Sequence, residues 1–189
     1  VTINGEDAFG KKVNNEYVAE HLRGKKGTKV TLGIKRGKSD ELIDYEVIRD
    51  KIPLNSIDAA FMLDKNVGYI KLDRFAQTSN TEFEESLAKL KTQKMKSLIL
   101  DLRGNTGGYL NIAAELSNQF LKKDMTIVYT EGDKSPKQIF NTDKNGKFTD
   151  GKLIILIDEG SASASEIVSG AVQDWDRGIL IGRRSFGKG

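Results

Sequence analysis

The sequence contains no cysteine and only one histidine, His21. Without cysteine the chain has no disulfide, no zinc site built from thiolates and no cysteine nucleophile. With one histidine, a Ser-His-Asp triad would have to use His21. Apolar runs are short, and none approaches the roughly 18 residues of a membrane span, so we expect no span in this chain. A serine nucleophile that does not use His21 must therefore find its base elsewhere.

The chain also lacks a large excess of one charge, because it has 30 Lys and Arg residues and 27 Asp and Glu residues, for a net charge of +3. The charges are spread without a long basic run, which excludes the electrostatic footprint of nucleic-acid binding. At 189 residues and 38% hydrophobic content, the chain is long enough for one core, or for a domain with a small appendage. It opens on Val1 without a methionine or a charged leader, so we expect it to be cut from a longer protein.

The hydrophobic pattern changes at about residue 52. In residues 1–52, Val30, Leu32 and Ile34 alternate with Thr, Gly and Lys, as in a half-buried strand. The elements expected in this part are a strand around Val1 and Ile3, a helix at 16–22, and strands at 29–35 and 42–49. Pro53 then marks a linker.

Residues 53–189 alternate strands with helices, which predicts an α/β core. Thr81–Glu84 has the pattern of a capping box, and the helix that it opens places Phe83, Leu87 and Leu90 on one face. The other expected elements are strands at 67–72, 97–102, 126–129, 153–157 and 179–181, a helix after residue 108 that carries Ile112, Leu116 and Phe120, and a helix at 163–175. The polar stretch 131–151 is expected to be an exposed hairpin or loop.

The serine-rich segment Gly160–Glu166 joins a buried strand to the last of these helices. Ser163 lies at the helix start, beside a core-facing stripe that runs from Ala164 to Trp175. There the free N–H groups of the first turn and the helix dipole favour negative charge, so a developing oxyanion could be stabilised. Ser163 to Glu166 also fit a capping box in which Ser163 is merely an N-cap. The segment alone leaves both interpretations open.

Two glycine-rich segments favour a catalytic interpretation. The turn Gly104–Gly108 ends a strand and opens a helix with two consecutive glycines, so its backbone can approach a substrate and aim N–H groups at it. Lys188 lies between two glycines and after Phe186, a setting that suits a lysine inserted into a site. Serine with a lysine base is a known variant of the triad, whereas His21, at the end of a small helix, has the pattern of a structural histidine.

Together these motifs resemble the carboxyl-terminal processing proteases, or tail-specific proteases, of peptidase family S41. The resemblance covers nearly the whole chain. Leu100–Gly108 is similar to the family's strand and glycine turn, with Thr106 where the family usually has proline. The segments Ser161–Glu166, Gln173–Asp174 and Phe186–Gly189 are similar to its active-site blocks, in the same order. The interval from Ser163 to Lys188 also fits the family.

The resemblance implies a serine endopeptidase that cleaves protein or peptide substrates near an exposed C-terminus through an acyl-enzyme, without metal or cofactor. The implied roles are nucleophile for Ser163, general base for Lys188 and oxyanion hole for the amides of Gly108 and Ala164, with Ser161 and Ser165 as bystanders. Such a base must be neutral, and free lysine has a pKa of about 10.4. The resemblance therefore implies a buried lysine, with Arg183 and Arg184 adding like-charge repulsion if they are near. The family's supporting glutamine, four residues beyond the lysine, is not in this chain.

The implied fold is α/β, an S41 peptidase core of the ClpP/crotonase-like type with stacked ββα units, over residues 53–189. The later part of a mostly-β PDZ domain would precede it, over residues 1–52. The strand to which a peptide adds in such a domain would lie before Val1, so we expect peptide capture to be impaired. The resemblance also implies a location in the bacterial cell envelope, the periplasm in particular. It leaves the oligomeric state open.

Asp174 is a tempting third member of a triad. It lies about three turns after Ser163 on a continuous helix, and so roughly 16 Å along the axis. It therefore cannot touch Ser163, and we interpret it as a structural acid that supports the fold by pairing with Arg177.

Two alternatives compete with a peptidase. Gly182–Lys188 matches most of a phosphate-binding loop, although Gly189 lacks the final hydroxyl. The other alternative is a peptide-binding or scaffold protein that keeps the fold while Ser163 and Lys188 are inert.

Overall fold

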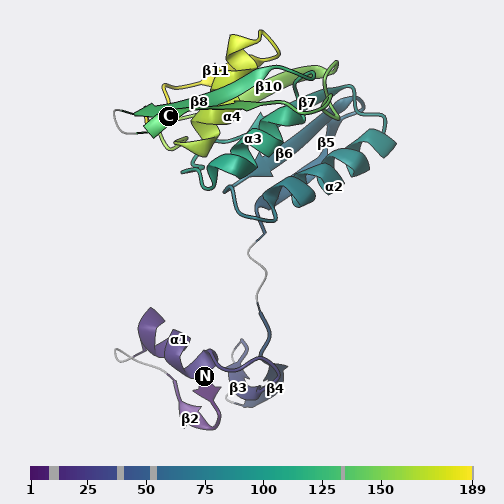
Figure 1. The fold of residues 1–189 in the computed structure, drawn as a ribbon. Helices are drawn as coiled ribbons and strands as arrows, with labels where there is room; N and C mark the ends of the chain where they lie inside the picture. The colour runs from purple at the N-terminus through teal and green to yellow at the C-terminus, as the bar shows by residue number, and fades with distance from the viewer. Residues whose placement is uncertain (9–12, 38–40, 52–54, 133–134, 189) are drawn as a thin grey trace. The chain divides into compact units, whose positions relative to one another are not determined.

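A computed structural model describes residues 1–8, 13–37, 41–51, 55–132 and 135–188. The chain forms two compact units, Val1–Leu54 and Asn55–Gly189, which are described separately (Figure 1). The division falls two residues after the one expected from the sequence. The linker expected at Pro53 lies outside the described residues.

The first unit is a small antiparallel sheet with one helix. Its elements are β1 (Thr2–Ile3), β2 (Glu6–Asp7), α1 (Asn15–Leu22), β3 (Lys29–Lys35) and β4 (Leu42–Ile48), with the strand order β2-β1-β3-β4. Asn14 caps α1, because its Oδ1 accepts the Tyr17 N–H at 2.8 Å. The described part buries three hydrophobic side chains, those of Ile3, Ala8 and Val30, whereas every residue of β4 is exposed. This unit therefore has a small core.

The second unit is a mixed five-stranded sheet with three helices, which confirms the expected α/β class. Its elements are β5 (Ile57–Asp64), β6 (Val67–Leu72), α2 (Ser79–Thr92), β7 (Ser97–Asp101), α3 (Leu110–Asn118), β8 (Thr126–Gly132), β9 (Ser135–Asn141), β10 (Lys152–Ile157), α4 (Ala164–Asp174) and β11 (Ile179–Gly182). The strand order is β11-β10-β7-β6-β5, with β5 antiparallel to β6 and the other pairs parallel. β8 and β9 form an antiparallel hairpin, which begins at Thr126, before the stretch 131–151 where a hairpin or loop was expected. That stretch is not exposed throughout, because Phe148 belongs to the hydrophobic core.

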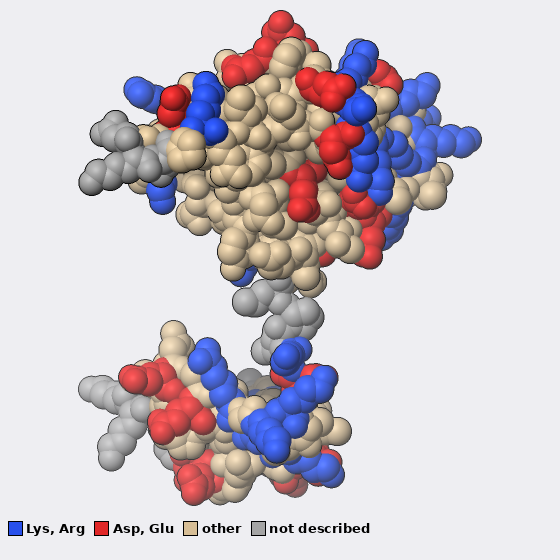
Figure 2. All heavy atoms as spheres, viewed as in Figure 1, with Lys and Arg blue, Asp and Glu red and all other residues tan. Residues whose placement is uncertain are grey.

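The helices bury one face of this sheet. In β6 the buried residues alternate, so that Gly68, Ile70 and Leu72 are buried while the residues between them are half-buried. The core cluster combines this face with the predicted stripe of α2 and the inner faces of α3 and α4. Its α2 members are Phe83, Leu87 and Leu90, each at most 1% exposed. Charged side chains of both signs lie side by side on the visible surface (Figure 2).

One expectation for this unit was wrong, and one strand was missed. The capping box expected at Thr81–Glu84 does not open α2, which begins at Ser79. Glu84 instead accepts hydrogen bonds from Gln119 and Lys147, because tertiary partners compete with the local cap. β5 was not expected, and its pairing with β6 has two register irregularities, which break the alternating pattern that identifies a strand in a sequence. Among the described helices, none is long and apolar enough to cross a membrane.

Replacing Phe83 by alanine tests this core. Its ring packs edge-on against Phe120 at 5.6 Å between centroids, so Phe83→Ala should lower the free energy of unfolding by about 3–5 kcal/mol. Lys89→Ala, on the exposed side of the same helix, should change it by less than about 0.5 kcal/mol. Urea unfolding measures both, and equal effects would contradict the assignment of the buried face.

Candidate functional site

Two turns meet at the carboxyl ends of neighbouring strands. β7 and β10 are parallel, with Leu100 opposite Ile155 and Asp101 opposite Leu156. The glycine-rich turn that follows β7 therefore starts beside the serine-rich turn that follows β10. The carboxyl ends of strands are where open α/β sheets bind ligands, so the two turns form a candidate site.

Asn105 joins these turns through both its side chain and its backbone. The side chain is buried, and its Nδ2 donates to the Leu72 carbonyl at 2.8 Å while its Oδ1 accepts the Gly107 N–H at 2.9 Å. Its carbonyl oxygen accepts the Ala162 N–H at 3.0 Å and the Ser165 hydroxyl at 2.9 Å. One residue thus ties the glycine turn to β6 and to the serine turn.

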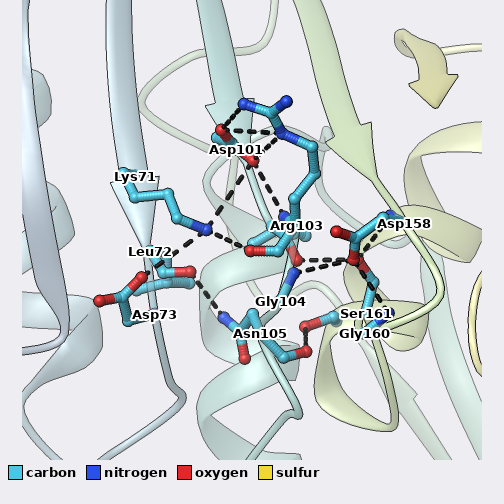
Figure 3. A network of polar contacts seen from close by, with 12 residues as sticks. Lys71, Leu72, Asp73, Asp101, Arg103, Gly104, Asn105, Asp158, Gly160 and Ser161 are labelled. Carbon is cyan, nitrogen blue, oxygen red and sulfur yellow. Dashed lines mark hydrogen bonds and ion pairs between the residues drawn. The ribbon is translucent and has the colours of Figure 1, made fainter.

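A second set of contacts between the turns is drawn in Figure 3. Asp158 Oδ1 accepts the Gly104 N–H at 2.8 Å and the Gly160 N–H at 3.0 Å. The hydrogen bond from the Gly104 backbone is the main cause that lowers the pKa of Asp158. Ser161 Oγ donates to the Leu102 carbonyl at 2.8 Å. Ser161 and Ser165, expected as bystanders, therefore hold the two turns together.

Ser163 occupies a strained backbone conformation directly before α4. Its φ of 55° and ψ of −111° lie in a region that L-residues rarely adopt, and its side chain is half-buried. The Ser163 N–H donates to Glu166 Oε2 at 2.8 Å, as in the expected capping box. An N-cap residue normally has an extended backbone, so a cap alone does not account for this strain.

The glycine turn lies against this serine without any intervening side chain. Gly107 has a φ of 102°, and a Cβ atom there would lie 2.7 Å from the Ala162 carbonyl oxygen and 2.9 Å from Ser163 Cβ. Gly108 has a φ of 153°, and its Cβ would collide with the Phe75 carbonyl group. Within the described ranges, the N–H groups of Gly108 and Ala164 donate to no other protein group. Two free amides are thus available near Ser163.

The backbone of Lys188 lies near the serine turn. The Lys188 N–H donates to Glu166 Oε2 at 2.9 Å, and the preceding Phe186 N–H donates to the Ser161 carbonyl at 3.0 Å. The Lys188 side chain, however, is exposed, and within the described ranges its ammonium group makes no hydrogen bond to Ser163. The burial expected for this lysine is therefore not present. Arg183 pairs with Glu159 at 2.7 Å, which compensates the charge expected to repel the lysine.

Two further residues considered in the sequence, Asp174 and His21, have other surroundings. Asp174 is exposed at the far end of α4 from Ser163. Its expected pair with Arg177 is wrong, because Arg177 donates instead to the carbonyls of Phe120 and Phe148, at 2.9 and 2.6 Å. His21, in the first unit, stacks on Tyr17 at 3.9 Å, and its Nδ1 lies 2.8 Å from the Tyr17 carbonyl. These local contacts agree with a structural role for His21, which stays a prediction.

The phosphate-loop interpretation of Gly182–Lys188 fails. The Gly187 and Lys188 N–H groups, which would face a phosphate, already bind the Glu166 carboxylate at 2.6 and 2.9 Å. The part of the chain that the structure describes also holds no cluster of three His, Asp or Glu side chains placed to bind a metal.

A buried carboxylate, Asp101, anchors the start of the glycine turn (Figure 3). It is 1% exposed, and its Oδ2 accepts hydrogen bonds from Arg103 Nη2 at 2.6 Å and from the Tyr69 hydroxyl at 2.7 Å. Burial alone would raise the pKa of Asp101, but these hydrogen bonds outweigh it and lower the pKa to about 2. Burial and the same contact raise the pKa of Tyr69 to about 12. Sequence reasoning missed Asp101 and Tyr69, because they belong to different strands.

Comparisons with known proteins agree with this geometry. The model of peptidase family S41 matches residues 66–189. The chain is 37% identical to the chloroplastic carboxyl-terminal-processing peptidase 3 of Arabidopsis thaliana, over 100% of this chain and 38% of that protein. It is 36% identical to the carboxy-terminal processing protease CtpA of Bacillus subtilis, over 100% of this chain and 40% of that protein. This chain therefore spans less than half the length of these two relatives.

Among solved structures, the photosystem II D1 C-terminal processing protease superposes with a TM-score of 0.64 at 25% identity. The match covers 100% of this chain and 52% of that one. It spans the sheet, the helices and both turns of the candidate site.

The close approach at Gly107 predicts a severe effect of a single methyl group. Gly107→Ala should lower the free energy of unfolding by about 2–4 kcal/mol, because it adds both a left-handed backbone penalty and contacts with Ala162 and Ser163. Gly170→Ala is the matched control, since a Cβ there meets nothing within 4 Å on helix α4. It should be neutral or stabilising by up to about 1 kcal/mol. Thermal unfolding that ranks the two variants the other way would contradict the packing described.

The pKa of Asp101 predicts an acid transition. Its lowered pKa means that its contribution to stability, about 2 kcal/mol, is complete above about pH 4 and is lost as the pH falls through about 2. Urea unfolding between pH 5 and pH 2 should therefore show a steeper loss for the wild type than for Asp101→Asn. Asp58→Asn, at an exposed position of β5, should keep the wild-type slope. Equal slopes for wild type and Asp101→Asn would contradict this assignment.

Proposed function

Because this chain belongs to peptidase family S41, we propose that it carries the site of a serine endopeptidase that cleaves proteins near their C-termini through an acyl-enzyme. The observation that carries the proposal is the strained backbone of Ser163, held against a glycine turn. A strained residue between a strand and a helix is costly, and such residues cluster where a side chain must be presented to a substrate. The protein or peptide substrate would present an exposed C-terminal segment.

In the proposed acylation step, Ser163 Oγ attacks the carbonyl carbon of the scissile peptide bond. The neutral amine of Lys188 accepts the hydroxyl proton and then gives it to the leaving amine as the C–N bond breaks. The ester that remains on Ser163 is hydrolysed by water, which returns the proton to the serine. Ser163, Lys188 and water account for every proton transferred in these reaction steps, so the proposed mechanism uses no metal or cofactor.

The N–H groups of Gly108 and Ala164 would bind the oxyanion that forms during attack. Both lack a partner among the described residues, and Ala164 lies at the start of α4, where the helix dipole favours negative charge. Free amides fixed by surrounding hydrogen bonds stabilise a developing charge without reorganisation. Asn105 supplies such fixation, because it binds the Gly107 N–H, one residue before Gly108, and the Ala162 N–H, two residues before Ala164.

The proposed base must lose a proton before it can act. Free lysine has a pKa of about 10.4, and desolvation is the usual means of favouring its neutral form. The exposed Lys188 side chain would therefore have to turn toward Ser163 and be covered when a polypeptide substrate occupies the site. Its backbone is already held at the serine turn by the hydrogen bond from the Lys188 N–H to Glu166.

Finer features of the fold belong to the same proposal. β5, β6 and α2 follow one another as a ββα unit, which supports a ClpP/crotonase-like core over residues 53–189. The strand, helix and two longer strands of the first unit support the later part of a PDZ domain over residues 1–52. We place the protein in the bacterial cell envelope, in the periplasm in particular, although one relative carries the word chloroplastic in its name.

Active-site labelling tests the proposed chemistry. A fluorophosphonate probe should modify the chain at Ser163, located by peptide mass spectrometry, and the chain should digest an unstructured protein such as casein. Ser163→Ala should abolish both reactions, and Lys188→Ala should slow labelling by at least about 100-fold, because a general base contributes about 10²–10⁴-fold.

Lys89→Ala removes an exposed lysine from α2 and serves as the control, with an expected labelling rate equal to that of the wild type. Digestion that survives Ser163→Ala would overturn the mechanism. A folded chain with neither labelling nor digestion, in this form and in a longer one, would favour the non-catalytic scaffold.

A further inference from the structure

One carboxylate connects the serine turn with the lysine loop, residues 185–188. Glu166 lies on the first turn of α4, and sequence reasoning assigned it only to a helix cap. Its two oxygens accept at least four hydrogen bonds from the residues that the structure describes. The donors are the N–H groups of Ser163 at 2.8 Å, Gly187 at 2.6 Å and Lys188 at 2.9 Å, and the Ser185 hydroxyl at 2.8 Å.

A single oxygen atom bridges the two segments. Glu166 Oε2 accepts both the Ser163 N–H and the Lys188 N–H. The two backbone nitrogens are therefore no farther apart than these two hydrogen bonds laid end to end. This contact determines where the Lys188 side chain begins relative to Ser163.

The lysine loop has few other attachments. Within the described residues, its one further backbone hydrogen bond to the serine turn runs from the Phe186 N–H to the Ser161 carbonyl. Phe186 and Lys188 are exposed, so burial of their side chains adds little. Gly187 has a φ of 87°, which favours glycine and allows consecutive N–H groups to face the same carboxylate. The position of the loop thus depends mainly on Glu166.

Only an ionised carboxylate suits this set of donors. A carboxylate is an acceptor on both oxygens, and its hydrogen bonds are charge-assisted and stronger than neutral ones. Glutamine has the same length, but its NH₂ group would face two of the donors and could accept no backbone N–H; at the Oε1 position it could only donate to the Ser185 hydroxyl. Glu166→Gln therefore releases part of the loop while it keeps the size of the side chain.

We propose that Glu166 is a positioning residue that holds Lys188 within reach of Ser163 by binding the backbones of both segments. This inference rests on the proposed function, in which the lysine is the general base. Glu166 acts through Lys188 and takes no proton from the substrate. Its removal should therefore matter only while Lys188 is present.

A double-mutant cycle on the full chain tests this coupling, with the second-order rate constant of Ser163 labelling by a fluorophosphonate as the readout. Glu166→Gln should slow labelling by about 10–100-fold when Lys188 is intact, because a misplaced base loses much of its contribution. In the Lys188→Ala background the same change should slow labelling by less than about 3-fold. Equal slowing in both backgrounds would overturn the proposal, because Glu166 would then act on Ser163 directly.

Two further variants test whether the slower labelling is specific to the Glu166 contacts and does not come from misfolding. Ser185→Ala removes one loop donor and leaves the carboxylate in place, so it should slow labelling by about 3–10-fold, again only with Lys188 present. Glu159→Gln removes a nearby carboxylate that pairs with Arg183 and touches neither segment, so it should leave labelling unchanged. An equal loss in Glu159→Gln would overturn the specific role of Glu166.

A readout independent of catalysis separates the two proposals. In Glu166→Gln, the backbone amides of Gly187 and Lys188 should exchange with solvent faster, as measured by NMR, while the core amides of β7 stay protected. Unchanged exchange at these two amides would overturn the role of Glu166 whatever the activity. Faster exchange with an unlabelled wild-type chain would keep the structural contact and overturn the proposed function instead.

Discussion

The parallel pairing of β7 with β10 is the constraint on which the rest of the site depends. Because the two strands run in the same direction, the turns that follow them begin at one edge of the sheet. The hydrogen bonds of Asn105 and Asp158 then become possible between residues more than fifty positions apart in the chain. The buried side chains of the sheet and of α2, α3 and α4 hold this pairing in place. The strain at Ser163 persists because these surrounding contacts over-determine its conformation.

Three carboxylates hold the turns of the site in place, and each does so by accepting hydrogen bonds from other parts of the chain. Asp101 binds Arg103 and Tyr69 at the end of β7, Asp158 binds two glycine amides, and Glu166 binds the amides of the serine turn and the lysine loop. Because the donors are mostly backbone N–H groups, these contacts need no further side chain between the turns. Gly104, Gly160 and Gly187 are therefore fixed by direct hydrogen bonds from their N–H groups to carboxylates, since they have no side chains to pack.

Local pattern was sufficient for much of the fold. The period of α2 identified Phe83, Leu87 and Leu90 as a buried face, and β3 and β6 have the bounds that their alternation predicts. Prediction failed where distant partners decide the outcome. Glu84 fits a capping box but binds Gln119 and Lys147, and Asp174 was assigned to Arg177, which binds two backbone carbonyls instead. Hydrogen-bond and ion-pair partners of this kind depend on which groups lie close together in the folded chain. Spacing along the sequence does not show that proximity.

By itself, the sequence predicted which residues carry the candidate chemistry, because Ser163, Lys188, Gly108 and Ala164 lie in motifs whose order and spacing resemble those of the peptidase family. It also excluded thiol chemistry outright, because there is no cysteine. Only the tertiary structure decided how these residues meet. It showed the backbone strain at Ser163, the exposure of Lys188 and the four hydrogen bonds of Glu166, none of which is a local property. Each depends on segments that approach one another only after the parallel sheet has formed.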